Sequence, residues 1–278
     1  MRPFPAALVL SLAASVSIAG CATWFNPAPH TQRATVVEYL YPKGEQPTLN
    51  PSLPELHLPL RVGIAFVPGE RAADLPETER DRLLHRVKDA FANRPYISAI
   101  EVIPTAYLRP RGGFENLEQA ARMFNVDVVT LISYDQVQFS DSNRLSLLYW
   151  TIVGAYVING SQYDVSTLVD ATVFDVKSRN MLFRAPGTSQ IKGSSALVKL
   201  SEASREARTE GYRQAIDEMI PRLDAQLEAF RTRVKEEKVA KIVHKPGYSG
   251  SGGSMDLAAL GLFGMAATVA VARRRRAG

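Results

Sequence analysis

The sequence of 278 residues contains one cysteine, Cys21. Intramolecular disulfide bonds and metal sites built from several cysteines are therefore excluded.

A basic surplus is also missing from the central part of the chain. Arg2 and Arg273–Arg276 supply five of the 33 Lys and Arg residues, and without them and Asp256 the chain has 28 basic and 27 acidic residues. Because nucleic-acid binding requires basic side chains spread over one face, we expect no nucleic-acid partner.

The motifs of common catalytic and metal sites are missing as well. The sequence has no Walker phosphate loop, no G-x-S-x-G turn and no H-E-x-x-H helix. Its four histidines lie far apart in the chain: His30, His57, His85 and His244. We therefore expect no catalytic residue, no metal site and no cofactor. An enzyme whose site is assembled from distant ionisable groups stays an open alternative.

The amino-terminal end has the layout of a secretory signal. Positions 6–18 are apolar apart from three serines and carry no charge, and a basic residue precedes them. The stretch ends in Ile18, Ala19, Gly20 and Cys21, which resembles a bacterial lipobox. The resemblance implies attachment of diacylglycerol to the Cys21 thiol, cleavage after Gly20 and acylation of the new amino terminus. A plain cleaved signal that happens to contain a cysteine is the alternative.

An acylated Cys21 fixes the chain to a membrane. One acyl chain binds a bilayer weakly, whereas two or three give stable anchoring, at about 0.8 kcal/mol per buried methylene group. Ala22 directly follows Cys21, at the position where an aspartate commonly retains Gram-negative lipoproteins at the inner membrane. We therefore expect a lipid bilayer and lipoprotein-processing enzymes as partners, and a location in the Gram-negative cell envelope, at the outer membrane or cell surface.

The carboxy-terminal end carries a second membrane-directed pattern. Residues 242–254 form a Gly/Ser linker that contains Gly252, Gly253 and Ser254. Residues 255–272 are almost entirely apolar, and we expect a short transmembrane helix there. Its 16 uncharged residues would span about 24 Å, less than the roughly 30 Å of a hydrocarbon core. The four arginines that follow predict a stop-transfer signal with residues 273–278 in the cytoplasm: Arg273, Arg274, Arg275 and Arg276.

This order of Gly-Gly motif, short apolar segment and arginine cluster resembles the sorting signal recognised by rhombosortases, which are rhomboid-type intramembrane proteases. Together with the lipobox, it is similar to the rhombotail, or rhombotarget, lipoprotein family. The resemblance implies cleavage near Gly252-Gly253 by a rhomboid-type protease. An uncleaved tail anchor is the alternative.

The central part has an ordinary globular composition, with 46% hydrophobic and 22% charged residues in the whole chain. We divide the chain into a signal peptide at 1–20, a Pro-rich tether at 21–59 and an α/β domain at 60–241. Apolar periodicity in the domain predicts alternating strands and helices, then hairpins. The expected elements are strands at 60–67, 99–104 and 126–134, helices at 76–93 and 117–124, a hairpin at 165–173 and 181–185, and a helix at 195–241 that Pro221 kinks or splits. One face of this last helix is apolar, with Leu223, Leu227, Phe230 and Val234.

This order predicts a single α/β sandwich of two or three layers, with a mixed sheet, late antiparallel hairpins and a long kinked carboxy-terminal helix. The pattern resembles the periplasmic lipoprotein domains related to curli-export and Tol-type folds. We therefore expect a non-catalytic envelope lipoprotein whose domain binds or assembles with an unknown protein partner. The alternative is an oligomeric assembly or secretion subunit like the curli-export lipoproteins, with residues 145–173 lining the oligomer.

Intact-mass analysis of the protein extracted from membranes tests both ends. We expect the mature chain to begin at an acylated Cys21 and to lack Arg273–Arg276. The variant Cys21→Ser should carry no acyl chain, because the thiol that accepts the lipid is gone. A fully acylated and membrane-retained Cys21→Ser chain would overturn the anchor, and an intact arginine run on the mature wild-type chain would overturn the processing.

Overall fold

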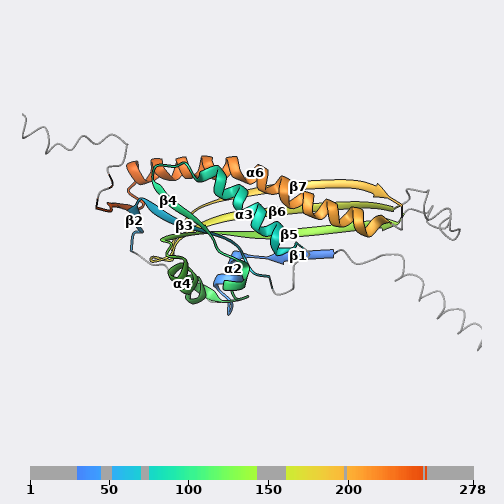
Figure 1. The fold of residues 1–278 in the computed structure, drawn as a ribbon, viewed down its shortest axis with the longest axis horizontal. Coiled ribbons are helices and arrows are strands. Elements are labelled where there is room, and N and C mark those ends of the chain that lie inside the picture. Colours follow the sequence, from blue (N-terminus) through green and yellow to red (C-terminus); the bar gives the residue numbers. More distant parts are fainter. Residues whose placement is uncertain are drawn as a thin grey trace, which may run out of the picture.

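The computed structural model describes residues 30–44, 52–69, 75–142, 161–196, 199–246 and 248. These residues form one mixed α/β sandwich, as the sequence predicts (Figure 1). The strands are β1 (His30–Ala34), β2 (Glu55–Leu58), β3 (Leu60–Phe66), β4 (Ile97–Val102), β5 (Val128–Ser142), β6 (Ser161–Asp175), β7 (Met181–Ser195) and β8 (Lys241–His244). The helices are α2 (Val36–Leu40), α3 (Glu77–Phe91), α4 (Gly113–Phe124) and α6 (Leu200–Glu236), with a 3₁₀ turn at Thr105–Tyr107.

The main sheet has six strands in the order β4-β3-β5-β6-β7, with β1 also paired to β5. Strand β3 runs parallel to β4 and to β5, and each parallel pair is joined through a helix, as the geometry of parallel pairs requires. Strands β5, β6 and β7 are antiparallel and each is 15 residues long. The predicted mixed sheet with late antiparallel pairing is therefore confirmed.

Helices cover both faces of the sheet. Successive residues of a strand point to opposite faces. On β6, Phe174 contacts Phe114 of α4, with ring centroids 6.0 Å apart. On the other face, Tyr134 of β5 contacts Tyr212 of α6, with centroids 5.9 Å apart. Helices α2 and α4 therefore form one outer layer, and α3 and α6 form the other (Figure 1).

Helix α6 is the longest element, and it runs through Pro221 without interruption. A proline inside a helix can kink it or split it, and the split at Pro221 does not occur. The helix starts at Leu200 rather than at 195, because Ser195 still pairs with Ser161 as the last residue of β7. The last turn carries Arg233 and Lys235, whose charges favour the negative end of the helix dipole.

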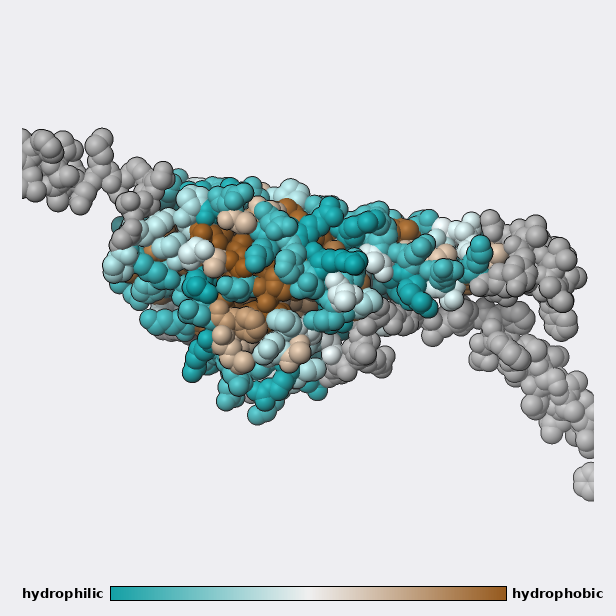
Figure 2. Space-filling model, in the orientation of Figure 1, coloured by the Kyte–Doolittle hydropathy of each residue, from teal (hydrophilic) through white to brown (hydrophobic). Residues whose placement is uncertain are grey.

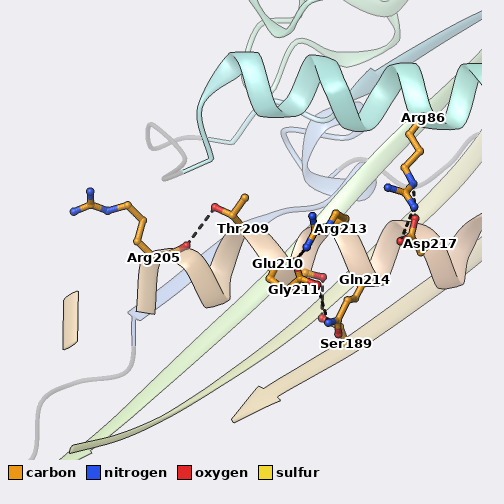
Figure 3. A network of polar contacts seen from close by, with 9 residues as sticks. All are labelled: Arg86, Ser189, Arg205, Thr209, Glu210, Gly211, Arg213, Gln214 and Asp217. Atoms are coloured by element: carbon orange, nitrogen blue, oxygen red, sulfur yellow. Dashed lines mark hydrogen bonds and ion pairs between the residues drawn. The ribbon is translucent and has the colours of Figure 1, made fainter. Parts of the chain in front are cut away.

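Close contacts attach the middle of α6 to the rest of the domain (Figure 3). The Arg86 guanidinium of α3 lies 2.6 Å from the Asp217 carboxylate. The Ser189 hydroxyl of β7 donates to the Gly211 carbonyl at 2.8 Å. Gly187 of β7 lies so close to α6 that a Cβ there would collide with the Ala215 carbonyl oxygen. This part of the helix therefore packs backbone against backbone on the sheet.

The fold includes parts of the segments that we expected to be tether and linker. Within 21–59, strand β1 and helix α2 belong to the sandwich, and Tyr39 is only 1% exposed. Strand β2 pairs in parallel with β8, which begins at the last residue of the predicted domain and continues into the predicted linker. The two short strands thus join segments about 186 positions apart in sequence.

The transmembrane helix is a correction. No helix among the described residues is long and apolar enough to cross a membrane. Helix α6 has the length, with 37 residues, but acidic and basic side chains recur throughout it, and each would be costly at bilayer depth. Residues 255–272, where we expected the span, lie outside the described residues, and so does the apolar stretch 145–158.

We expect Gly187→Val to lower the free energy of unfolding by about 1–3 kcal/mol, since the added side chain must push α6 away from β7. The midpoint of urea unfolding measures this change in the free energy of unfolding. Ser194→Ala, on the exposed face of the same strand, is the control and should leave the midpoint unchanged. Equal midpoints for Gly187→Val and the wild type would contradict the close packing.

Candidate functional site

A cavity of about 920 Å³ lies between the sheet and the outer layer formed by α3 and α6. Its floor is made by β3, β4, β5, β6 and β7, and β2, β8 and Tyr248 also contribute to its wall. Hydrophobic surface gathers on this face of the molecule beside α3 and over β3 and β4, bordered by hydrophilic residues (Figure 2). The cavity is the candidate functional site.

The floor follows from the register of the sheet. Val62 and Ile64 of β3 stand two residues apart and so point to the same face. They pair with Val128 and Thr130 of β5, and Thr130 pairs in turn with Val173 of β6. All five side chains line the cavity. A run of β-branched residues on one face of three strands thus makes a flat, apolar floor.

The wall comes from one face of α6. Leu223, Leu227, Phe230 and Val234 recur at intervals of three and four residues, which the sequence analysis identifies as an apolar helix face. All four line the cavity. Phe230 also contacts Phe183 of β7, with ring centroids 5.4 Å apart, and closes the space between helix and sheet at that point.

One rim of the cavity is polar. The guanidinium carbon of Arg231 lies 4.9 Å from the centre of the Tyr96 ring. The His244 ring of β8 lies against Tyr248, with centroids 5.8 Å apart, and the Tyr248 hydroxyl donates to the Pro95 carbonyl at 3.2 Å. Lys235 follows Arg231 by one helical turn and also lines the cavity. We call Tyr96, Arg231, Lys235, His244 and Tyr248 the polar rim.

The charge of the polar rim is positive. No Asp or Glu is among the described residues that line the cavity, whereas Lys88, Arg231 and Lys235 are. Glu228 stands outside the lining and lies 2.7 Å from Arg231, so it neutralises that guanidinium. For Lys235 the described part of the chain offers no ion pair. Its ammonium group is therefore an uncompensated charge of the polar rim, and Lys88, for which the described residues also offer no ion pair, adds a second one to the lining.

The Tyr96 hydroxyl is a buried rim group whose hydrogen bonding is incomplete. The oxygen is buried and has no hydrogen-bond partner among the described residues. Burial raises the pKa of the Tyr96 hydroxyl above its ordinary value, although the nearby Arg94 and Arg231 partly oppose the shift. The group is thus a neutral phenol at physiological pH. A buried polar atom without a partner costs free energy and often marks a functional site.

The described residues contain no group of three or more His, Cys, Asp or Glu side chains that could hold a metal ion. His57 lies in β2, and His85 is an exposed residue of α3 whose Nδ1 is 2.9 Å from the Asp81 carbonyl oxygen. Of His57, His85 and His244, whose side chains the structure describes, only His244 lines the cavity. The residues predicted for lipidation and processing all lie outside the described residues: Ile18, Ala19, Gly20, Cys21, Gly252, Gly253, Ser254 and Arg273–Arg276.

The cavity was not predicted from the sequence, because segments that are far apart in the chain form it. Leu56 and Leu58 come from the predicted tether, and Ile242, His244 and Tyr248 come from the predicted linker. A signal is present in both places. The alternating run of residues 55–60 and the β-branched pair at 242–243 are typical of short strands.

No family model matches the chain, and no curated protein matches it. Solved structures do. The neuraminyllactose-binding hemagglutinin homolog from Helicobacter pylori is 11% identical, with a TM-score of 0.39, over 69% of this chain and 96% of that one. A PelC dodecamer from Paraburkholderia phytofirmans is 12% identical, with a TM-score of 0.28, over 70% and 97%. A DUF330 protein from Xanthomonas campestris is 14% identical, with a TM-score of 0.29, over 68% and 93%. None of these three descriptions names an enzymatic activity.

Two matched Tyr→Phe variants test whether the Tyr96 hydroxyl of the polar rim lacks a hydrogen-bond partner. Tyr39 donates a hydrogen bond to Asn116 at 3.1 Å, so Tyr39→Phe should lower the free energy of unfolding by about 1 kcal/mol. Tyr96→Phe removes a buried hydroxyl without a partner, so it should leave the free energy of unfolding unchanged or raise it by up to about 1 kcal/mol. Urea unfolding measures both. A loss for Tyr96→Phe as large as that for Tyr39→Phe would mean that the Tyr96 hydroxyl is already hydrogen-bonded.

Proposed function

We propose that this chain is a non-catalytic lipoprotein of the cell envelope whose α/β domain binds an apolar ligand in the cavity. In this proposal Cys21 carries the lipid anchor, and a rhomboid-type protease processes the chain near Gly252-Gly253. The observation that carries the ligand-binding function is the size of the cavity, about 920 Å³, together with its lining of aliphatic and aromatic side chains. Small-molecule sites usually measure about 300–1,000 Å³ and are mostly apolar.

A packing defect is a poor explanation for a space of this size. Protein interiors are packed as densely as organic crystals, and voids larger than a water molecule are few. The rest of this domain follows that rule, since Ala65, Val129, Leu131 and Ile132 of β3 and β5 are fully buried. On the floor of the cavity, Ile64, Val128 and Thr130 are also nearly buried, at 3–4% exposed, whereas Leu60, Val62 and Leu227 of the lining are only partly buried. Selection for ligand binding explains why larger side chains that could fill the space are absent.

The lipid anchor would hold the cavity near a source of apolar ligands. Cys21 precedes the start of β1, at His30, by nine residues. An extended chain covers at most about 3.3–3.6 Å per residue, so the start of β1 would stay within about 30 Å of the bilayer surface. His30 pairs with Gln138, ten residues along β5 from Val128 of the cavity floor, so the cavity would lie at most about 33 Å farther away. A membrane at that distance supplies acyl chains and other apolar molecules to the cavity.

The uncharged fluorophore N-phenyl-1-naphthylamine tests the proposal, because its emission rises when it leaves water for an apolar site. We expect saturable binding to the full chain with a micromolar dissociation constant. Leu227→Trp should weaken binding at least about tenfold, since the indole occupies the cavity.

Ala229→Trp is the matched control, because it adds the same indole to an exposed position of α6 outside the cavity. It should bind the fluorophore like the wild type. Equal loss in both variants, or no saturable binding to the wild type, would remove the proposed function. Circular dichroism confirms that each variant keeps its helix and strand content.

A further inference from the structure

We propose that the ligand is a two-chain anionic lipid whose acyl chains fill the apolar cavity and whose phosphodiester lies at the polar rim. This inference rests on the proposed function and adds the chemical class of the ligand. Three observations carry it: the volume of the cavity, the uncompensated charge of Lys235 and the unpaired hydroxyl of Tyr96.

The volume fits two acyl chains. A methylene group takes about as much room as a water molecule, whose share of the liquid is roughly 30 Å³. The 920 Å³ of the cavity, which is partly open to solvent, therefore accommodate at most about 30 methylene groups, or two chains of about 15 carbons. A single chain of that length would leave half the space without contacts, and dispersion contacts with the apolar lining would be lost.

The charge of the rim selects the headgroup. Arg231 and Lys235 stand at positions i and i+4 of α6, where like charges repel each other. Glu228 relieves only Arg231. An anionic phosphodiester beside Lys235 would relieve the remaining repulsion and gain charge-assisted hydrogen bonds. A cationic amphiphile would add to the repulsion.

Tyr96 gives the headgroup a hydrogen bond. Its ring lies against the Arg231 guanidinium, and both the guanidinium groups of Arg94 and Arg231 and the carboxylates of Glu228 and Asp224 lie close enough to act on the buried hydroxyl. A neutral phenol donates to a phosphate oxygen, and that bond would satisfy a group that the described residues leave unpaired. The same side chain thus contacts the cavity through its ring and the headgroup through its hydroxyl.

The chain itself holds a competing occupant. Tyr248 belongs to the polar rim, and the apolar residues 257–272 follow it after a short Gly/Ser stretch. Four arginines end that segment, however, and a positively charged rim repels them. The charge of the rim therefore favours the anionic lipid over the tail, and the experiment must distinguish the two.

Photo-crosslinking of the full chain in a non-ionic detergent tests the inference. The probes carry one diazirine on an acyl chain and differ in their headgroup or chain number: phosphatidylglycerol, phosphatidylethanolamine and free palmitate. Mass spectrometry locates the labelled residues. We expect phosphatidylglycerol to label residues of α6 and β3 that line the cavity, about three- to tenfold more than the zwitterionic lipid and more than palmitate.

Lys235→Gln should reduce the preference for phosphatidylglycerol to within about twofold and leave labelling by phosphatidylethanolamine unchanged. Tyr96→Phe should weaken labelling by both phospholipids, because each offers phosphate oxygens to the hydroxyl. Arg205→Gln is the matched control, since it removes an exposed cation at the other end of α6 and should change neither preference.

Three outcomes would overturn the inference. The first is equal labelling by the two phospholipids in the wild type, and the second is stronger labelling by palmitate than by either. The third is a rise of more than about tenfold in phospholipid labelling when Leu260→Glu and Phe263→Glu disrupt the apolar tail, which would assign the cavity to the tail. In the first two outcomes N-phenyl-1-naphthylamine still binds, so they differ from failure of the proposed function, in which it does not.

Discussion

The contact between β7 and the first half of α6 determines how the outer layer lies on the sheet. Gly187 lets the backbone of the strand meet the helix at Ala215, and the Ser189 hydroxyl is bonded to the Gly211 carbonyl. The lining of the cavity begins on α6 only at Leu223, after Pro221. The helix thus packs directly on the sheet before its proline and borders an open apolar space beyond it. The position of the cavity depends on that change along a single helix.

The cavity concentrates features that a protein selected only for stability would avoid. Leu60 and Val62 of β3 and Leu227 of α6 stay only partly buried, and the Tyr96 hydroxyl is buried without a partner among the described residues. The Tyr39 hydroxyl, by contrast, reaches Asn116, although Gln136 Oε1 and Ser204 Oγ, which do not line the cavity, are also buried without a partner among the described residues. Departures of this kind are expected at functional sites, where a ligand supplies the missing contacts. Their occurrence together in one place supports binding more strongly than either would alone.

Local patterns predicted the parts of the fold that are built from long elements. The spacing of Leu223, Leu227 and Phe230 identified the cavity face of α6, and continuous apolar runs identified β3 and β5. The pairing of β2 with β8 could not be predicted, because each strand has four residues and its partner lies at the other end of the domain. Because the sequence alone does not show that pairing, we predicted the segments that complete the cavity to be tether and linker. The transmembrane helix was inferred from an apolar run and the four arginines after it, and a run of this length does not distinguish a span from other apolar segments.

The pairing of β2 with β8 also brings the two ends of the domain to the cavity. Lys245 donates to the Pro59 carbonyl at 3.2 Å and lies 3.0 Å from the Asp127 carboxylate, so the end of β8 is held beside the start of β3. Tyr248 then reaches the polar rim. Gly252 follows it by four residues, a distance of at most about 14 Å in an extended chain. Cleavage at Gly252-Gly253, as we propose, would separate the four arginines of the tail from the domain that carries the positively charged rim.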